Sequence, residues 1–387
     1  MNAPTGNWNY PTKVRFGAGR ISELAPACKS LGMKRPLLVT DPGLAKLPMV
    51  ADAVAANAAA GLPTAVFSDI KPNPIGKNVD DGVKAFKAGK HDGVIAFGGG
   101  SALDAGKAVA LMAGQTRPMW DFEDVGDNWK RVDAQGIAPV VSVPTTSGTG
   151  SEVGRASVIA DEATHTKKII FHPGMMPGIV ICDPALTVGL PPHITAATGM
   201  DAFAHCLEAY CAPGFHPLAD GIALEGMRLV KEWLTVAVKD GKNIEARSHM
   251  MAAAAMGATA FQKGLGAIHS LSHPVGAVYD THHGLTNAVF MPYVLVFNKA
   301  AVAERLTRAG RYLGLAKPGF DGFLEFVLGL RTELKIPHTC KELGVQESRL
   351  PELSKMAAED PTAGGNPVPV GAAEMRVMFD RAMAGTV

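Results

Sequence analysis

A carboxylate and an imidazole share one predicted helix face in the second half of the chain. Asp201 and His205 stand four residues apart in "GMDAFAHCLEAY" (199–210), a segment of small and apolar residues typical of a buried helix. Residues four apart lie on the same side of a helix, so both side chains would point to one place. A carboxylate and an imidazole that meet in this way are suited to bind a divalent cation.

A local cluster of histidines adds to this pair. His269, His273, His282 and His283 fall within fifteen residues and make up a third of the twelve histidines. A single histidine in an apolar helix is usually a core residue, but six candidate ligands in one apolar region favour a metal site. Six exceed the need of a tetrahedral site, so the spacing does not separate ligands from residues with another role. Four protein ligands would close a tetrahedral zinc site, so a catalytic role favours Fe²⁺, which accepts further ligands.

A glycine-rich turn in the first half is suited to bind phosphate groups. "VIAFGGGSALDAGKAVA" (94–110) places three glycines and Ser101 between a predicted strand and a predicted helix. Glycines let the backbone approach an anion, and the start of a helix offers free N–H groups and a positive dipole end. Ser101 is also a plausible cap for that helix. Asp104 and Lys107 belong to the same motif, and the sequence assigns them no role.

Two further segments fit a bound nucleotide. Asp41 follows the apolar run "LLVT", where a carboxylate can accept both ribose hydroxyls of an adenosine and would repel a 2′-phosphate. "PTTSGTGSE" (144–152) follows another apolar run with hydroxyls and glycines. Open α/β sheets bind ligands at the carboxyl ends of their strands, where both segments would lie.

The apolar runs of the first half alternate with helical patterns, which predicts a doubly wound, Rossmann-like α/β layer with a parallel sheet. The expected strands lie at 35–40, 64–69, 92–100, 138–146 and 178–184, with a weaker hairpin pattern at 157–171. Beyond residue 186 the strand patterns end and helical patterns continue. We therefore expect an α/β domain at 1–186 and an all-helical domain at 187–387, while "EDPTAGGNPVPVG" (359–371) is rich in helix breakers.

Composition narrows the classes of protein. A net charge of +1 with mixed signs predicts no binding to nucleic acid or to an anionic membrane surface. The sequence contains no run of eighteen apolar residues, so it predicts no membrane-spanning helix. Five cysteines without a C-x-x-C spacing indicate free thiols in a reducing compartment. With no signal peptide evident, the sequence predicts a cytoplasmic protein.

The motifs together resemble the iron-dependent (group III) alcohol dehydrogenase family over nearly the whole chain, and the resemblance implies a dehydroquinate-synthase-like architecture. The segments that carry this resemblance are "GGGSALDAGK", "PTTSGTGSE", "LPPHITAATGMDAFAHCLEAY", "HSLSHPVGAVYDTHHG" and "NPVP". Several long motifs in the same order make the match specific.

The resemblance implies roles for individual residues. The metal ligands would be Asp201, His205, His269 and His283. His273 would lie beside the nicotinamide and relay a proton, while His282 would not be a ligand. The residues implied to contact NAD are Asp41, Gly98, Gly99, Gly100, Ser101, Thr145, Thr146, Thr149 and Lys168, the last across a gap in the spacing.

The implied activity is hydride transfer between a small primary or secondary alcohol or diol, bound at Fe²⁺, and NAD. Zn²⁺ or another divalent ion could occupy the same ligands. The implied partners are an alcohol or aldehyde substrate and a second copy of the chain, in a homodimer or larger homo-oligomer.

Alternatives with related architecture remain open at this point. They are glycerol dehydrogenase, maleylacetate reductase, a hydroxyacid–oxoacid transhydrogenase and the lyase that makes dehydroquinate. The lyase predicts a basic cluster near the metal, and residues 200–290 contain no such run. A non-catalytic protein whose metal only holds helices together is a further alternative, and it would have no use for His273.

Overall fold

The protein is described here by a computed structural model, which covers residues 6–8, 12–164 and 166–387. The chain divides into two compact units. The first unit consists of Met1–Thr146 and Gly150–Gly189, and the second consists of Ser147–Thr149 and Leu190–Val387. Each unit has its own hydrophobic core, as expected for a chain of 387 residues.

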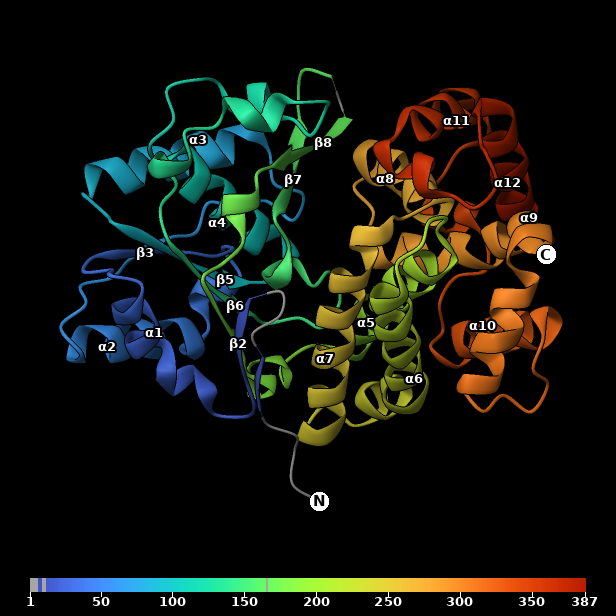
Figure 1. Ribbon diagram of the computed structural model, residues 1–387, viewed down its shortest axis with the longest axis horizontal. Helices are drawn as coiled ribbons and strands as arrows, with labels where there is room; N and C mark the ends of the chain where they lie inside the picture. The colour runs from blue at the N-terminus through green and yellow to red at the C-terminus, as the bar shows by residue number, and fades with distance from the viewer. Residues whose placement is uncertain (1–5, 9–11, 165) are drawn as a thin grey trace. The chain divides into compact units, whose positions relative to one another are not determined.

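A seven-stranded sheet forms the middle of the first unit (Figure 1). Its strand order is β1-β2-β9-β6-β5-β3-β4, and all neighbours are parallel except β1 and β2. The strands are β1 (Gly6–Trp8), β2 (Lys13–Phe16), β3 (Pro36–Val39), β4 (Ala65–Phe67), β5 (Gly93–Gly98), β6 (Val140–Pro144) and β9 (Ile179–Cys182). Because parallel neighbours run in the same direction, the carboxyl ends of β3, β5 and β6 lie side by side.

Helices cover both faces of this sheet because its strands are apolar on both sides. In β5, Val94 and Ala96 pack with α3 and α4, whereas Ile95 and Phe97 pack with α1 and α2. Successive residues of a strand point to opposite faces, so one continuous apolar run serves two cores. The helices are α1 (Leu24–Ser30), α2 (Pro48–Ala59), α3 (Gly76–Ala88) and α4 (Gly100–Met112).

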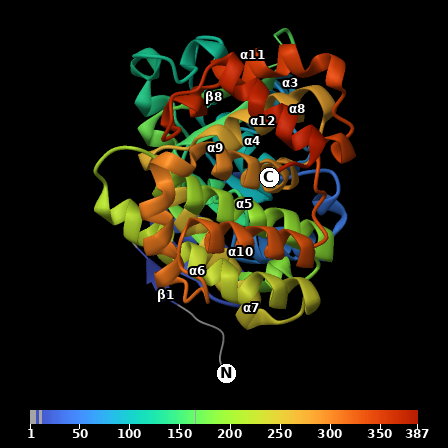
Figure 2. The ribbon, with the colours of Figure 1, turned by 90° about the vertical axis from the view of Figure 1, so that its right-hand side faces the viewer.

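The second unit is helical throughout. Its helices are α5 (Pro192–Cys211), α6 (Pro217–Lys239), α7 (Ile244–Ala260), α8 (Ala267–Tyr279), α9 (His283–Tyr312), α10 (Phe320–Glu333), α11 (Leu350–Glu359) and α12 (Ala372–Ala384). α5 lies among α6, α7 and α9, and these four helices can be followed by their labels in Figure 2. Residues 195–211 of α5 are buried without interruption, so any polar group on this helix must find its partner inside the unit.

α9 is long and apolar enough, by length and composition, to cross a membrane, and it is the one such helix among the described residues. In this structure, however, 67% of its apolar window is buried inside the protein. Burial of this kind is what the central helix of a folded domain shows.

The predicted fold class, a doubly wound α/β layer followed by helices, is confirmed. Each of the five expected strands is present within its predicted range, and the hairpin expected at 157–171 is present as the antiparallel pair β7 (Ala156–Asp161) and β8 (Thr166–Phe171), which begins one residue earlier. β1 and β2 were not predicted. The prediction that Ser101 caps its helix was wrong, because α4 begins at Gly100 and its cap position is Gly99.

Truncating a side chain at the centre of the sheet tests this packing. Ile95 is 0% exposed on β5, so Ile95→Ala should lower the free energy of unfolding by about 2–5 kcal/mol. Val66 on β4 is 43% exposed, and Val66→Ala should change it by about 0.5 kcal/mol or less. Urea unfolding of both variants measures the difference, and equal losses would contradict the burial described here.

Candidate functional site

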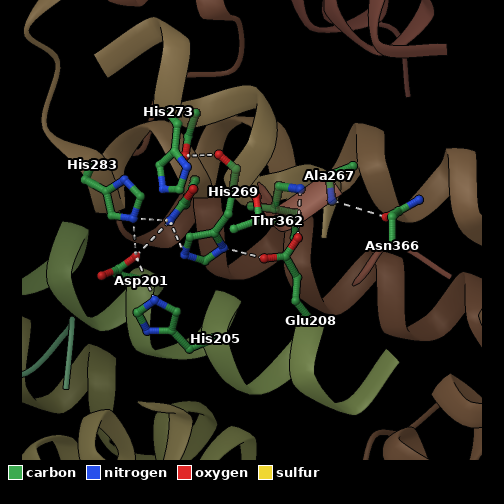
Figure 3. A network of polar contacts seen from close by, with 12 residues as sticks. Asp201, His205, Glu208, Ala267, His269, His273, His283, Thr362 and Asn366 are labelled. Carbon is green, nitrogen blue, oxygen red and sulfur yellow. Dashed lines mark hydrogen bonds and ion pairs between the residues drawn. The ribbon is translucent and has the colours of Figure 1, made fainter. Parts of the chain in front are cut away.

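Four side chains from three helices meet inside the helical unit (Figure 3). Asp201 and His205 come from α5, His269 from α8 and His283 from the first turn of α9. One potential ligand atom of each residue lies within 4.8 Å of those of the other three. Three of the four residues are buried and His283 is partly exposed, so the group can be reached from one side.

Asp201 lies at the centre of this group. Its Oδ1 is 3.9 Å from Nε2 of His205 and 3.6 Å from Nε2 of His283. The rings of His205 and His269 stack with their centroids 4.8 Å apart. The shared helix face predicted for Asp201 and His205 is therefore present, and it faces imidazoles of two other helices.

Glu208 holds the ring of His269 in place by a contact at its Nδ1. Its Oε1 accepts a hydrogen bond from the backbone N–H of Ile268 at 2.8 Å, and its Oε2 contacts Nδ1 of His269. An ionised carboxylate can only accept, so in the neutral ring Nδ1 carries the hydrogen and Nε2 is left with a lone pair. Burial alone would lower the pKa of His269, but the Glu208 carboxylate raises it.

His205 is held neutral by its surroundings. Burial lowers the pKa of His205 to about 4, although the neighbouring Asp201 carboxylate opposes that shift. A neutral imidazole is the form that binds metal ions, so this environment suits a ligand.

Asn287, one turn after His283, completes the buried polar group. Its Nδ2 donates to Oδ1 of Asp201 at 2.8 Å and lies 3.1 Å from Nε2 of His283 and 3.2 Å from Nε2 of His269. The amide has two hydrogens, so it can donate to two of these three acceptors at a time.

The remaining two histidine candidates have other partners. His273 of α8 stacks on the ring of His283, with centroids 5.3 Å apart, and its Nδ1 lies 2.8 Å from Oδ2 of Asp360. His282 stands at the cap position of α9, where its Nδ1 accepts from the backbone N–H of Leu285 at 3.4 Å. The structure thus separates these two from the group of four.

The donors of the group fit a divalent cation. Three imidazoles and one carboxylate are the mixed nitrogen and oxygen set that Zn²⁺ and Fe²⁺ accept, and one imidazole has its Nε2 lone pair fixed by a carboxylate. The use of Asp201, His205, His269 and His283 as ligands stays a prediction, which the geometry makes specific.

The glycine-rich turn of the first unit joins β5 to α4, as the sequence predicts. Gly98 has φ +148°, and a Cβ there would meet the Cβ of Ala102 at 2.8 Å, so only glycine fits. The carbonyl of Gly98 accepts from the N–H of Thr145 at 2.9 Å, which ties this turn to the segment after β6. The hydroxyl of Ser101 donates to the carbonyl of Pro72.

Other predicted nucleotide contacts are distributed as follows. Asp41 lies two residues after the end of β3 at Val39, a strand that pairs with β5, and its Oδ1 accepts from the N–H groups of Gly43 and Leu44, both at 2.9 Å. Thr146 lies next to Gly99, whereas Thr149 belongs to the second unit.

Lys168 lies on the β7–β8 hairpin. Its ammonium pairs with Asp161 at 2.9 Å and with Glu123 at 3.6 Å, and it lies over the ring of Trp120. The hydrogen bond with Asp161 raises the pKa of Lys168 above its usual value.

Asp104 and Lys107 connect α4 to the segment that follows β6. The Lys107 ammonium is buried and donates to the carbonyls of Ser151 at 2.9 Å and of Ala156, while Asp104 accepts from the N–H of Val158 at 3.0 Å. Burial lowers the pKa of Lys107, and the Asp104 carboxylate 3.3 Å away opposes that shift.

Sequence models of known families match both units. The model described as "Iron-containing alcohol dehydrogenase" matches residues 11–184, and the one described as "Fe-containing alcohol dehydrogenase family, C-terminal" matches residues 195–383. The chain belongs to the iron-containing alcohol dehydrogenase family. It is therefore an oxidoreductase, and the resemblance seen in the sequence motifs is confirmed.

Relatives of this alcohol dehydrogenase match it over almost their full length. A 4-hydroxybutyrate dehydrogenase of Cupriavidus necator is 38% identical over 97% of this chain and 99% of its own. An NAD-dependent methanol dehydrogenase of Bacillus methanolicus is 36% identical over 93% and 95%. The solved structure of a 1,3-propanediol oxidoreductase has a TM-score of 0.90 at 31% identity and covers 99% and 100%.

Three residues at the site of this alcohol dehydrogenase were not predicted from the sequence: Glu208, Asn287 and Asp360. Glu208 had a detectable signal, because it lies seven residues after Asp201 and therefore on the same helix face. Asn287 likewise lies four residues after His283. Asp360 is 87 residues from its partner His273, and no local spacing points to it.

A close approach of two helices keeps His283 near Asp201. A Cβ added at Gly284 of α9 would lie 2.3 Å from the carbonyl oxygen of Ala197 and 2.8 Å from the Cβ of Asp201, both on α5. Gly284→Ala should therefore separate α9 from α5, weaken Zn²⁺ binding by about tenfold or more, and cost about 1–3 kcal/mol of stability.

Gly221 on α6 is the matched control, because a Cβ there has no neighbour within 4 Å. Gly221→Ala should leave Zn²⁺ affinity unchanged. Calorimetric titration of metal-stripped protein with Zn²⁺ compares the two variants, and wild-type affinity in Gly284→Ala would show that this close approach does not set the geometry.

Proposed function

We propose that this alcohol dehydrogenase is NAD-linked and depends on a divalent ion, with Fe²⁺ as the favoured ion. The reaction would interconvert a small primary or secondary alcohol, or a diol, and the corresponding aldehyde or ketone. The observation that supports this most directly is the convergence of Asp201, His205, His269 and His283 within 4.8 Å of one another.

These four residues would hold the ion, with Glu208 and Asn287 orienting them. When bound, a divalent ion acts as a Lewis acid that lowers the pKa of an alcohol hydroxyl and stabilises the negative charge that develops on its oxygen. The partial exposure of His283 leaves the group open on one side, where a substrate could enter.

His273 would accept the hydroxyl proton at Nε2. Its Nδ1 faces Asp360, so the opposite ring nitrogen is the one available to a substrate. The His273 side chain is 12% exposed, which permits transfer of the proton onward to solvent.

Residues at the carboxyl edge of the sheet would bind NAD. The backbone of Gly98, Gly99 and Gly100 would meet the pyrophosphate at the start of α4, and the Ser101 hydroxyl would join them by donating to a phosphate oxygen in place of the Pro72 carbonyl. Asp41 would accept the adenosine ribose hydroxyls, which favours NAD over NADP. Further contacts are proposed from Thr145, Thr146, Thr149 and Lys168.

The names of the relatives support a short substrate that carries a primary hydroxyl. They are a 4-hydroxybutyrate dehydrogenase, a methanol dehydrogenase and a 1,3-propanediol oxidoreductase. We also propose that residues 1–186 form the coenzyme-binding domain and residues 187–387 the metal-binding domain. Homo-oligomeric assembly and a cytoplasmic location stay predictions from the sequence.

Reloading stripped protein with metal tests the proposal. Protein treated with chelator should form no NADH from methanol, 1,3-propanediol or 4-hydroxybutyrate, and Fe²⁺ added without oxygen should restore turnover of at least one alcohol. Zn²⁺ should restore less. His205→Ala should bind less than one ion per chain and stay inactive, because it removes one of the four donors.

His193→Ala is the matched control, since His193 is exposed on the same helix. It should bind metal and turn over alcohol like the wild type. Stoichiometric metal binding by wild-type protein without turnover of any alcohol or aldehyde would contradict the proposed activity.

A further inference from the structure

We propose that Asp360 is a positioning residue for proton transfer, because it holds the ring of His273 in the orientation and tautomer that leave Nε2 as a proton acceptor. This inference rests on the proposed function, in which His273 accepts the proton of the alcohol. It concerns a residue outside the four candidate ligands.

The contact between the two residues is direct and sheltered. Oδ2 of Asp360 lies 2.8 Å from Nδ1 of His273, and the two side chains are only 9% and 12% exposed. Oδ1 of Asp360 accepts from the N–H of Thr362 at 2.9 Å and from its hydroxyl at 2.5 Å. Each carboxylate oxygen therefore has its own partners, and the carboxylate cannot turn without losing hydrogen bonds.

The backbone around Asp360 is fixed by the same residues. Asp360 ends α11 and caps the short helix η12 (Pro361–Gly365), and both elements pack against α8, which carries His273. Asp360 thus faces His273 from a segment that its own side chain helps to form. A residue that served only as a helix cap would not need its second oxygen directed at an imidazole.

A neutral imidazole can carry its hydrogen on either ring nitrogen, so a neighbouring group must determine which tautomer forms. The His273 ring stacks on His283 at 19° and meets His269 edge-on at 73°, and neither ring contact is a hydrogen bond that would select one nitrogen. An ionised carboxylate accepts but does not donate, so a neutral His273 beside it carries its hydrogen on Nδ1. Nε2 then has the lone pair that can receive a proton.

The charge state of Asp360 agrees with this role. Burial opposes its ionisation, but the contact with His273 and the hydrogen bonds from Thr362 hold the pKa of Asp360 at about 2. The Asp360 carboxylate is therefore ionised near neutral pH, and it accepts hydrogen bonds without donating any.

Asp360→Asn separates this role from helix capping. Asparagine caps helices as well as aspartate does, so its carbonyl oxygen can keep the bonds from Thr362. Its NH₂ group would then face Nδ1 of His273 and donate to it, which forces the hydrogen of a neutral ring onto Nε2. The variant should keep its fold and reverse the tautomer.

The expected result is a fall in kcat of about 10- to 100-fold with little change in KM for the alcohol and no loss of bound metal. Adding Asp360→Asn to His273→Ala should cause no further loss of kcat, because the two residues act through one ring. Long-range ¹H–¹⁵N spectra should show the hydrogen of the His273 ring moved from Nδ1 to Nε2.

Glu359→Gln is the matched control, because Glu359 is the neighbouring carboxylate, is 66% exposed and pairs only loosely with Lys355 at 3.9 Å. It should leave kcat and KM unchanged. If Asp360→Asn does not fold, Thr362→Val replaces it as the test, with an expected few-fold loss of kcat that disappears in the His273→Ala background.

Two results would overturn the inference: wild-type kcat in a folded Asp360→Asn protein, or an equal loss of kcat with and without the His273 ring, which would make the role of Asp360 merely structural. These outcomes are distinct from failure of the proposed function. In that case wild-type protein loaded with metal would turn over no alcohol, and His273→Ala would have nothing to impair.

Discussion

Bringing one carboxylate and three imidazoles to a single buried point requires three helices to approach closely. α5 and α9 meet at Gly284, where a larger residue would collide with the backbone of α5. The carboxylate and imidazoles lie inside an apolar unit, where an unpaired polar group is costly. Glu208 provides a partner for His269, and Asn287 provides one for Asp201, so the site and the helix packing depend on each other.

Contact between a buried carboxylate and Nδ1 of a histidine occurs twice near the four candidate ligands. Glu208 contacts Nδ1 of His269, and Asp360 contacts Nδ1 of His273, so in each case a buried carboxylate fixes which ring nitrogen is left bare. The consequences differ because the bare nitrogens have different surroundings. That of His269 lies within the group of four, whereas His273 is the ring outside it, and we assign the first to metal binding and the second to proton transfer.

Much of the fold followed from local patterns, because a strand buried on both faces must be apolar along its whole length, as β5 is. β1 and β2 were missed because they are short strands at one edge of the sheet, and their pairing with each other and with β9 is set by tertiary contacts. The cap of α4 was misplaced because the φ of Gly98 lets the helix begin earlier. Asp201 and His205 were visible from their spacing, but Asp360 meets His273 only through the packing of α11 and η12 on α8.

We expect one divalent ion to bind among these four residues. Anomalous diffraction from crystals of the iron-loaded protein, recorded at the iron absorption edge, tests it most directly. One strong peak per chain is expected, about 2.0–2.3 Å from a carboxylate oxygen of Asp201 and from imidazole nitrogens of His205, His269 and His283. A peak at another place in a protein that binds iron stoichiometrically would contradict it.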